Sequence, residues 1–375
     1  MRTAVTEQLG IEFPILAFSH CRDVVAAVTK AGGMGVLGAI GLTPDQLATE
    51  LRWIEDEVGD LPYGVDILLP VNEGETPAKG ASRADILPDT HVDFVLALMA
   101  EHGMEVTRDD LWRSSGLASQ GTQLWSERSA SLLDVAFEHR IGLIASALGS
   151  PSEKMIAGAR EHDVRTAALA GKVQHAQRSV ARGVDFIVAQ GTEAGGHTGE
   201  IATMVLVPEI VDAVAPVPVI AAGGIARGRQ IAAAMALGAQ GVWCGSVWLT
   251  TEEAETAPAV KEKFLAASSS DTVRSRYRTG KPARQLRSDW TDAWERPDAP
   301  PPLPTPFQSV LAEPALARAA QAALQPGSPA RPLATYFVGQ VVGSMNKVQP
   351  TRRVVLDMVE EYIDAMEQLN AWTNG

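Results

Sequence analysis

Residues 217–249 read VPVIAAGGIARGRQIAAAMALGAQGVWCGSVWL, and this stretch contains one complete strand–helix–strand unit. An apolar run at 217–222 predicts a buried strand that ends at the Gly-Gly pair 223–224. Residues 228–237 have helical spacing, and a second apolar run covers 241–249. Because a strand, a helix and a further strand in this order normally join two parallel strands, the stretch predicts a βαβ unit.

The same alternation continues along most of the chain. Its apolar runs are continuous rather than alternating, which indicates strands buried on both faces and therefore parallel. Eight such strands with helical crossovers predict an α/β fold, a closed TIM (β/α)8 barrel, in preference to an open doubly wound sheet. The predicted strands cover residues 14–18, 35–39, 63–69, 142–148, 165–170, 186–190, 217–222 and 241–249. The predicted helices cover residues 23–31, 44–58, 152–162, 173–183, 203–214 and 228–237.

A barrel needs roughly 250 residues, so a chain of 375 residues has segments to spare. We predict that residues 1–70 and 124–250 form the barrel. Residues 71–123 are predicted to be an insertion on its C-terminal face, with an amphipathic piece at 92–101. We expect a helical or lid region with a proline-rich connection at 251–332, and C-terminal helices at 333–375 that pack back on the barrel.

Composition narrows the classes of partner. The formal net charge of −13 disfavours nucleic acid and anionic membranes, because an acidic surface repels both. The two cysteines, Cys21 and Cys244, lie far apart and show no metal-ligand spacing, so we expect no metal site. No apolar run resembles a signal sequence or approaches the ~20 residues of a spanning helix. We therefore expect a cytoplasmic protein, with a homodimer as an open possibility.

The strongest chemical signal is QGTEAGGHTG at 190–199, which follows one predicted strand directly and precedes a helix. In a barrel that junction lies on the active-site face. Glycines there let the backbone approach a flat ligand closely, and His197 lies among them rather than on an apolar helix face. The alternative is an ordinary glycine-rich turn with a surface histidine.

Two further glycine sites follow the seventh and eighth strands. Gly223 and Gly224 are expected to present backbone amides to a phosphate, and Gly245 and Ser246 to add more donors. TIM barrels frequently bind phosphate in these loops. The Gly-x-Gly-x-x-Gly at 33–38 runs from helix to strand, the reverse of a dinucleotide site. One phosphate site beside a glycine-lined slot favours FMN over FAD.

These stretches resemble the nitronate monooxygenase family, formerly called 2-nitropropane dioxygenases, whose relatives include FMN-dependent enoyl-acyl-carrier-protein reductases. The resemblance covers nearly the whole chain except roughly 70–125 and the proline-rich stretch. Its matching segments are PIL at 14–16, AGGMGVLGA at 31–39, YGVDILL at 63–69, VAQGTEAGGHTGE at 188–200, residues 218–242 and GQVVG at 339–343.

The resemblance implies a role for each matching position. His197 would face the substrate over the flavin as the catalytic residue. The implied FMN-binding residues are Ala17, Phe18, Asp66, Gln190, Gly195, Gly196, Gly223, Gly224, Gly245 and Ser246. The chain departs from the family at Asp66, where Asn is common, at Ser246, where Thr is commoner, and in a shortened loop after Ala17-Phe18-Ser19. A carboxylate near the flavin would disfavour its anionic reduced form, so Asp66 is expected to point elsewhere or to be paired.

Three functions remain open at this point. The first is a flavin-dependent monooxygenase that oxidises alkyl nitronates with O2, with a histidine of near-neutral pKa as base. The second is an NAD(P)H-dependent enone or enoyl-thioester reductase on the same scaffold, and the third is a flavin-binding protein without turnover. In the first two cases the partner is a small-molecule substrate. The basic run at 274–287 is either a solvated face or part of a lid that meets an anion.

Overall fold

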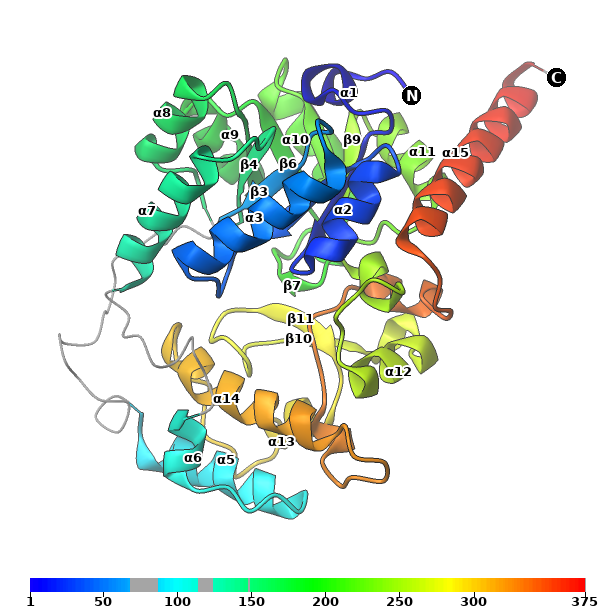
Figure 1. The fold of residues 1–375 in the computed structure, drawn as a ribbon. Coiled ribbons are helices and arrows are strands. Elements are labelled where there is room, and N and C mark those ends of the chain that lie inside the picture. The colour runs from blue at the N-terminus through cyan, green and yellow to red at the C-terminus, as the bar shows by residue number, and fades with distance from the viewer. Residues whose placement is uncertain (68–86, 114–123, 148, 375) are drawn as a thin grey trace.

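A computed structural model describes residues 1–67, 87–113, 124–147 and 149–374. Its centre is a closed barrel of eight parallel strands in the order β1-β2-β3-β4-β5-β6-β8-β9, which confirms the TIM-barrel prediction (Figure 1). The strands are β1 Ile15–Ser19, β2 Met34–Gly38, β3 Gly64–Asp66, β4 Leu143–Ser146, β5 Arg165–Ala170, β6 Phe186–Gln190, β8 Val219–Ala222 and β9 Gly241–Cys244.

Helices cover the outside of the barrel, and most lie where the helical spacing predicted them. They are α2 Arg22–Lys30, α3 Pro44–Val58, α7 Leu124–Phe137, α8 Glu153–Glu161, α9 Val173–Ala181, α10 Thr203–Val214, α11 Gly228–Ala236 and α15 Thr351–Asn374. A Cβ at Gly35 would collide with the Val25 backbone, so this glycine of the 33–38 run serves the packing of α2 on β2.

The barrel interior is filled by one set of side chains from alternate strand positions. Leu16, Val36, Val188 and Trp243 belong to this set, together with Val5 and Leu9 of α1 Ala4–Leu9. The helix α1 therefore closes the N-terminal end of the barrel, and the C-terminal end lies on the opposite side, toward β7 Gly196–His197 (Figure 1).

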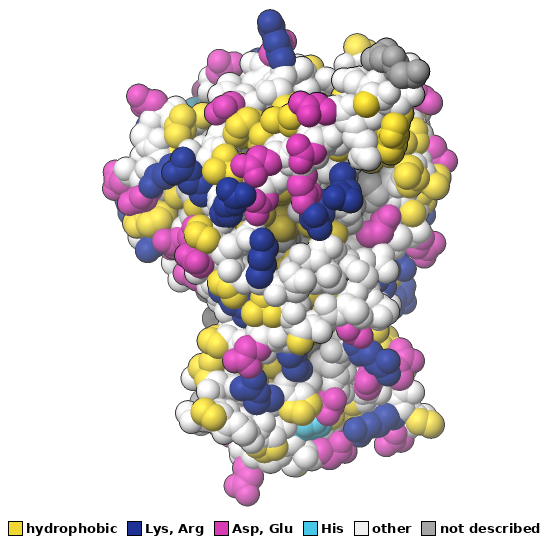
Figure 2. Space-filling model, turned by 90° about the vertical axis from the view of Figure 1, so that its right-hand side faces the viewer, with side chains coloured by type: hydrophobic (Ala, Val, Ile, Leu, Met, Phe, Trp, Pro, Cys, Tyr) yellow, Lys and Arg dark blue, Asp and Glu magenta, His cyan; other side chains and the backbone are white. Residues whose placement is uncertain are grey.

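A smaller lobe lies beyond the C-terminal ends of the strands (Figures 1 and 2). Its core joins the insertion to the region after the barrel, since Val95 and Leu98 pack in one cluster with Trp290 and Leu311. Residues 87–111 of the predicted insertion and the 251–332 region thus share one core, although the sequence suggested two separate segments. Its elements are α5 Asp89–Glu101, α6 Arg108–Arg113, α12 Pro258–Ala266, β10 Thr272–Ser275, β11 Ala283–Leu286, α13 Asp289–Ala293 and α14 Phe307–Ala322, with 3-10 turns η2 Ser269–Asp271 and η3 Arg331–Leu333.

Two predicted elements end earlier or begin later than expected. The eighth strand stops at Cys244, and residues 246–250 form a 3-10 turn, η1 Ser246–Thr250. Residues 333–350, predicted as helical, contain the 3-10 turn η4 Gln340–Ser344 and irregular chain before α15 begins. The predicted strand residues 68, 69 and 148 lie outside the described part of the chain. No helix in the described ranges is long and apolar enough to span a membrane.

The face shown in Figure 2 carries basic and acidic side chains interspersed, without a continuous basic stripe. This face offers nothing like the single-sign surface with which proteins track a nucleic-acid backbone.

Candidate active site

Strand alternation decides which predicted residues can face the mouth of the barrel. Leu16 lies in the interior cluster, whereas Ala17 packs outward with Val24 and Val28 of α2. Phe18 therefore points inward again, and its ring stacks on Trp243 with centroids 6.3 Å apart. Of the predicted pair beside the flavin, Phe18 presents its side chain to the mouth and Ala17 does not.

The predicted residues Asp66 and Gln190 also lie at inward positions. Val65 packs outward against α3, so Asp66 faces the interior, and Gln190 follows the inward-facing Val188 by two residues. Asp66 is 3% exposed, and its Oδ2 has no hydrogen-bond partner in the described ranges. Burial raises the pKa of this carboxyl to about 7, although the amide of Ala147 donates to it. Asp66 therefore faces the barrel interior, with one carboxylate oxygen paired to a backbone amide and the other without a partner in the described ranges.

The glycines after β8 and β9 form a cradle of backbone at the mouth. Gly223 and Gly224 have φ of +97° and +72°, which favours glycine at both positions. A Cβ at Gly223 would lie 2.9 Å from the Gly191 carbonyl, whereas a Cβ at Gly245 would meet only Phe18 Cδ1 at 3.8 Å. Gly223 is thus required by its neighbours, while Gly245 borders open space.

Free backbone donors come from these loops rather than from the first turn of α11. The amides of Ala226 and Arg227 donate to Gln230 Oε1, and that of Gly228 donates to Glu361. Across the described ranges, no acceptor is found for the amides of Gly224, Gly245 and Ser246. Side chains already occupy the N-terminus of α11, so the loop amides are the donors that remain without an acceptor in the described ranges.

The segment around Gly339 completes the cradle from far along the chain. Its amide donates to Ser246 Oγ at 2.8 Å, and the Gln340 amide donates to the Glu193 carbonyl at 2.9 Å. A Cβ at Gly195 would lie 2.8 Å from the Gly339 nitrogen, so both glycines are needed for this close approach. The GQVVG stretch was the only signal in the sequence for this contact, and it carried no predicted role.

Glu193 fixes the loop that carries the glycines. Its carboxylate accepts from the Thr203 amide at 3.0 Å and lies 2.9 Å from Thr203 Oγ1. The same hydroxyl lies 2.9 Å from the Gly223 carbonyl. Thr203 thereby connects the loop after β6 to the loop after β8, a role that no motif in the sequence indicated.

His197 is held by the smaller lobe rather than by the barrel. It lies on β7, which pairs antiparallel with β11 through Ala283, and its Nε2 is 2.9 Å from Thr279 Oγ1. Burial, together with the charges of Lys281 and Arg278, lowers its pKa to about 4, and Glu313 acts in the opposite direction. The ring is therefore neutral at pH 7 but a weaker base than the sequence suggested.

Three arginines of the basic run 274–287 make contacts within the protein. Arg274 bonds to Thr198, and Arg284 donates to the Thr192 carbonyl, so both reach the glycine-rich loop. Arg278 is buried in a bidentate pair with Glu313 at 2.7 and 2.9 Å, with its guanidinium 4.4 Å from the Phe337 ring centre. The run is therefore not simply a solvated basic face, because these three arginines have partners within the protein.

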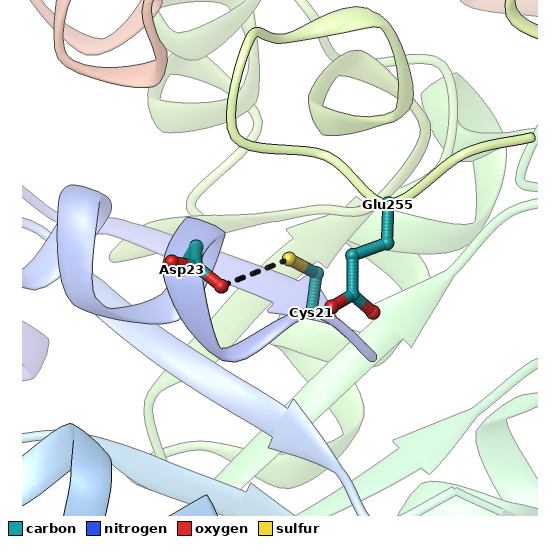
Figure 3. A group of neighbouring side chains, drawn as sticks. All are labelled: Cys21, Asp23 and Glu255. Carbon is teal, nitrogen blue, oxygen red and sulfur yellow. Dashed lines mark hydrogen bonds between the residues drawn. The ribbon is translucent and has the colours of Figure 1, made fainter. Parts of the chain in front are cut away.

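One group of side chains outside the mouth has spacing that a metal ion would allow. Donor atoms of Cys21, Asp23 and Glu255 lie within 4.8 Å of one another, an arrangement that the sequence spacing had hidden (Figure 3). However, the Cys21 thiol donates to the Glu253 carbonyl at 3.1 Å, and burial together with the Glu255 charge raises its pKa. These conditions favour the thiol over the thiolate that metals bind.

Comparison with known proteins identifies the family of this chain. The family model described as Nitronate monooxygenase matches residues 2–361. The chain is 61% identical over 374 residues to a Mycobacterium tuberculosis (strain ATCC 25618 / H37Rv) protein described as "Putative monooxygenase Rv1533", covering 98% of each. It is 30% identical to a "Probable nitronate monooxygenase" of Staphylococcus saprophyticus, covering 77% of this chain and 80% of that protein.

Two solved structures are similar over almost their full length. Nitroalkane oxidase from Streptomyces ansochromogenes has a TM-score of 0.79 and 26% identity, covering 98% of this chain and 100% of that one. FabK from Thermotoga maritima has a TM-score of 0.73 and 28% identity, covering 99% of each chain. The protein therefore belongs to the nitronate monooxygenase family and is an oxidoreductase.

Proposed function

We propose that the protein is an FMN-dependent nitronate monooxygenase that oxidises alkyl nitronates with O2. The observation that carries the proposal is a neutral His197 beside the Lys281 ammonium, while the charge of the neighbouring Arg278 is balanced by its pair with Glu313. A cation beside the reacting position favours an anionic substrate, and a nitronate is the anion of a nitroalkane. A weak base also suits a substrate that arrives already deprotonated.

The residues at the mouth fit FMN. The loop amides of Gly224, Gly245 and Ser246 would hold the phosphate, and Phe18 and Gln190 would lie beside the ring system. The open space at Gly196, where a Cβ would meet nothing within 4 Å, allows a flat group to approach the backbone. When bound, FMN supplies the redox chemistry, and the protein supplies orientation and electrostatics.

The chain's own groups would act on the substrate in two ways. Lys281 attracts the anion electrostatically, whereas the charge of Arg278 is compensated by its buried pair with Glu313. The bound anion in turn raises the pKa of His197, so the imidazole can accept a proton beside the substrate.

An oxygen-electrode assay tests the proposal. Protein checked for bound flavin is supplied with a panel of alkyl nitronates in air, and we expect oxygen uptake without any added nicotinamide. No oxygen uptake with any nitronate would remove the proposed activity.

The similarity to FabK supports a second candidate, an NAD(P)H-dependent reductase of enones or enoyl thioesters. This activity needs a nicotinamide donor and does not consume nitronates. Oxidation of NADH or NADPH that depends on an enone or enoyl thioester, without nitronate turnover, would favour this second function.

A further inference from the structure

We propose that Thr279 is a positioning residue that holds His197 as its Nε2–H tautomer and leaves Nδ1 as the proton-accepting atom. The inference rests on the proposed function for its role in turnover. The tautomer itself is a property of the protein and can be measured without any substrate.

The contacts of the Thr279 hydroxyl carry the inference. A hydroxyl has one proton to donate and two lone pairs with which to accept. Thr279 Oγ1 donates to the Lys281 carbonyl at 3.1 Å, so its proton is committed within its own turn. It therefore faces His197 Nε2, 2.9 Å away, as an acceptor, and the shared proton belongs to the histidine.

The position of Thr279 is itself well fixed. The residue is 8% exposed, and its carbonyl accepts a hydrogen bond from the Thr305 hydroxyl. The Gly280 amide donates to the Arg276 carbonyl at 2.9 Å and closes the same turn. The hydroxyl thus keeps its direction without help from the histidine.

The other ring nitrogen remains available. In the described ranges no hydrogen bond reaches His197 Nδ1. When a neutral nitroalkane is deprotonated, the C–H bond breaks, its proton goes to Nδ1, and the electron pair stays on the substrate as the nitronate. Nε2–H still donates to Thr279 after this transfer, so the protonated ring needs no rearrangement.

Two variants separate the hydroxyl from the volume of the side chain. Thr279→Val keeps the shape and removes the acceptor, whereas Thr279→Ser keeps the acceptor. Thr291→Val is a matched control, since Thr291 is a buried threonine of the same lobe whose hydroxyl donates to the Ser288 carbonyl. Histidine-ring 15N NMR of ring-labelled protein at pH 7 reports which nitrogen carries the proton, and His197→Asn identifies the signal among the seven histidines.

We expect wild type, Thr279→Ser and Thr291→Val to show a protonated Nε2 and a bare Nδ1 at His197, and Thr279→Val to show a mixture of tautomers. With a neutral nitroalkane, Thr279→Val should lower kcat on the order of tenfold, less than the 10²–10⁴-fold typical of losing a base. KM should stay unchanged, and Thr279→Ser should restore the rate.

A protonated Nδ1 in the wild type, or an unchanged tautomer in Thr279→Val, would overturn the inference. If the NMR result is as expected but the protein does not turn over nitronates, the tautomer assignment stands and the proposed function fails.

Discussion

Replacing Gly245 with alanine should weaken FMN binding while leaving the fold intact. Gly245 has φ of −118°, which alanine adopts without strain, and the added Cβ would contact only Phe18 Cδ1 at an ordinary 3.8 Å. The fold should even gain about 0.4–1 kcal/mol, since alanine restricts the unfolded chain more than glycine does. The methyl group, however, would occupy space that the phosphate needs beside the Gly245 and Ser246 amides.

The expected loss of affinity follows from one hydrogen bond to a charged group. Such a bond contributes roughly 1.5–3 kcal/mol, and each ~1.4 kcal/mol changes the dissociation constant tenfold. Gly245→Ala should therefore raise the Kd for FMN roughly 10- to 100-fold. Quenching of FMN fluorescence on titration with FMN-free protein measures this, and urea unfolding of the same protein measures the stability.

Gly223→Ala is the matched comparison. Its φ of +97° costs alanine about 1–2 kcal/mol, and the Cβ would lie 2.9 Å from both the Gly191 carbonyl and Thr203 Oγ1. This variant should lose stability as well as flavin. If Gly245→Ala binds FMN as tightly as wild type, the Gly245 and Ser246 amides do not hold the phosphate.

Three further predictions concern the smaller lobe and the histidine that it holds. His197→Asn should keep its FMN, because backbone groups hold the cofactor. Its rate should fall roughly 10²–10⁴-fold on neutral nitroalkanes but less on preformed nitronates. Equal rates of wild type and variant on a neutral nitroalkane would exclude His197 as the base. His197 binds its proton at about pH 4 when folded and near 6.5 when unfolded, so the unfolded state gains protons between these values. The free energy of unfolding should therefore fall by about 3 kcal/mol as pH drops from 6.5 to 4, and urea titrations of His197→Asn should lack that contribution. Glu313→Gln should cost about 3 kcal/mol, because it leaves the buried Arg278 charge without its carboxylate, and an unchanged urea midpoint would show that the pair contributes little.

The sequence was sufficient for the barrel because its signals are local. A strand buried on both faces needs a continuous apolar run, and a backbone with positive φ favours glycine. The strands and the pairs 223–224 and 245–246 could therefore be located before any contact was known. The end of β9 was misplaced because Ser246–Thr250 is as apolar as a strand, and only the turn toward Gly339 shows that the ladder stops at Cys244.

What the sequence alone determined is thus the eight-stranded barrel, the glycine-rich loops at its mouth and the histidine among them. Only the tertiary structure decided which residues position the glycine-rich loops and the histidine, and what pKa the histidine has, because the residues responsible are distant in the chain. Thr279 lies 82 positions from His197 and Gly339 lies 93 positions from Ser246. The low pKa of His197 arises because the smaller lobe buries the ring beside Lys281 and Arg278. Burial and long-range charge are properties of the assembled chain, and no spacing between neighbouring residues encodes them.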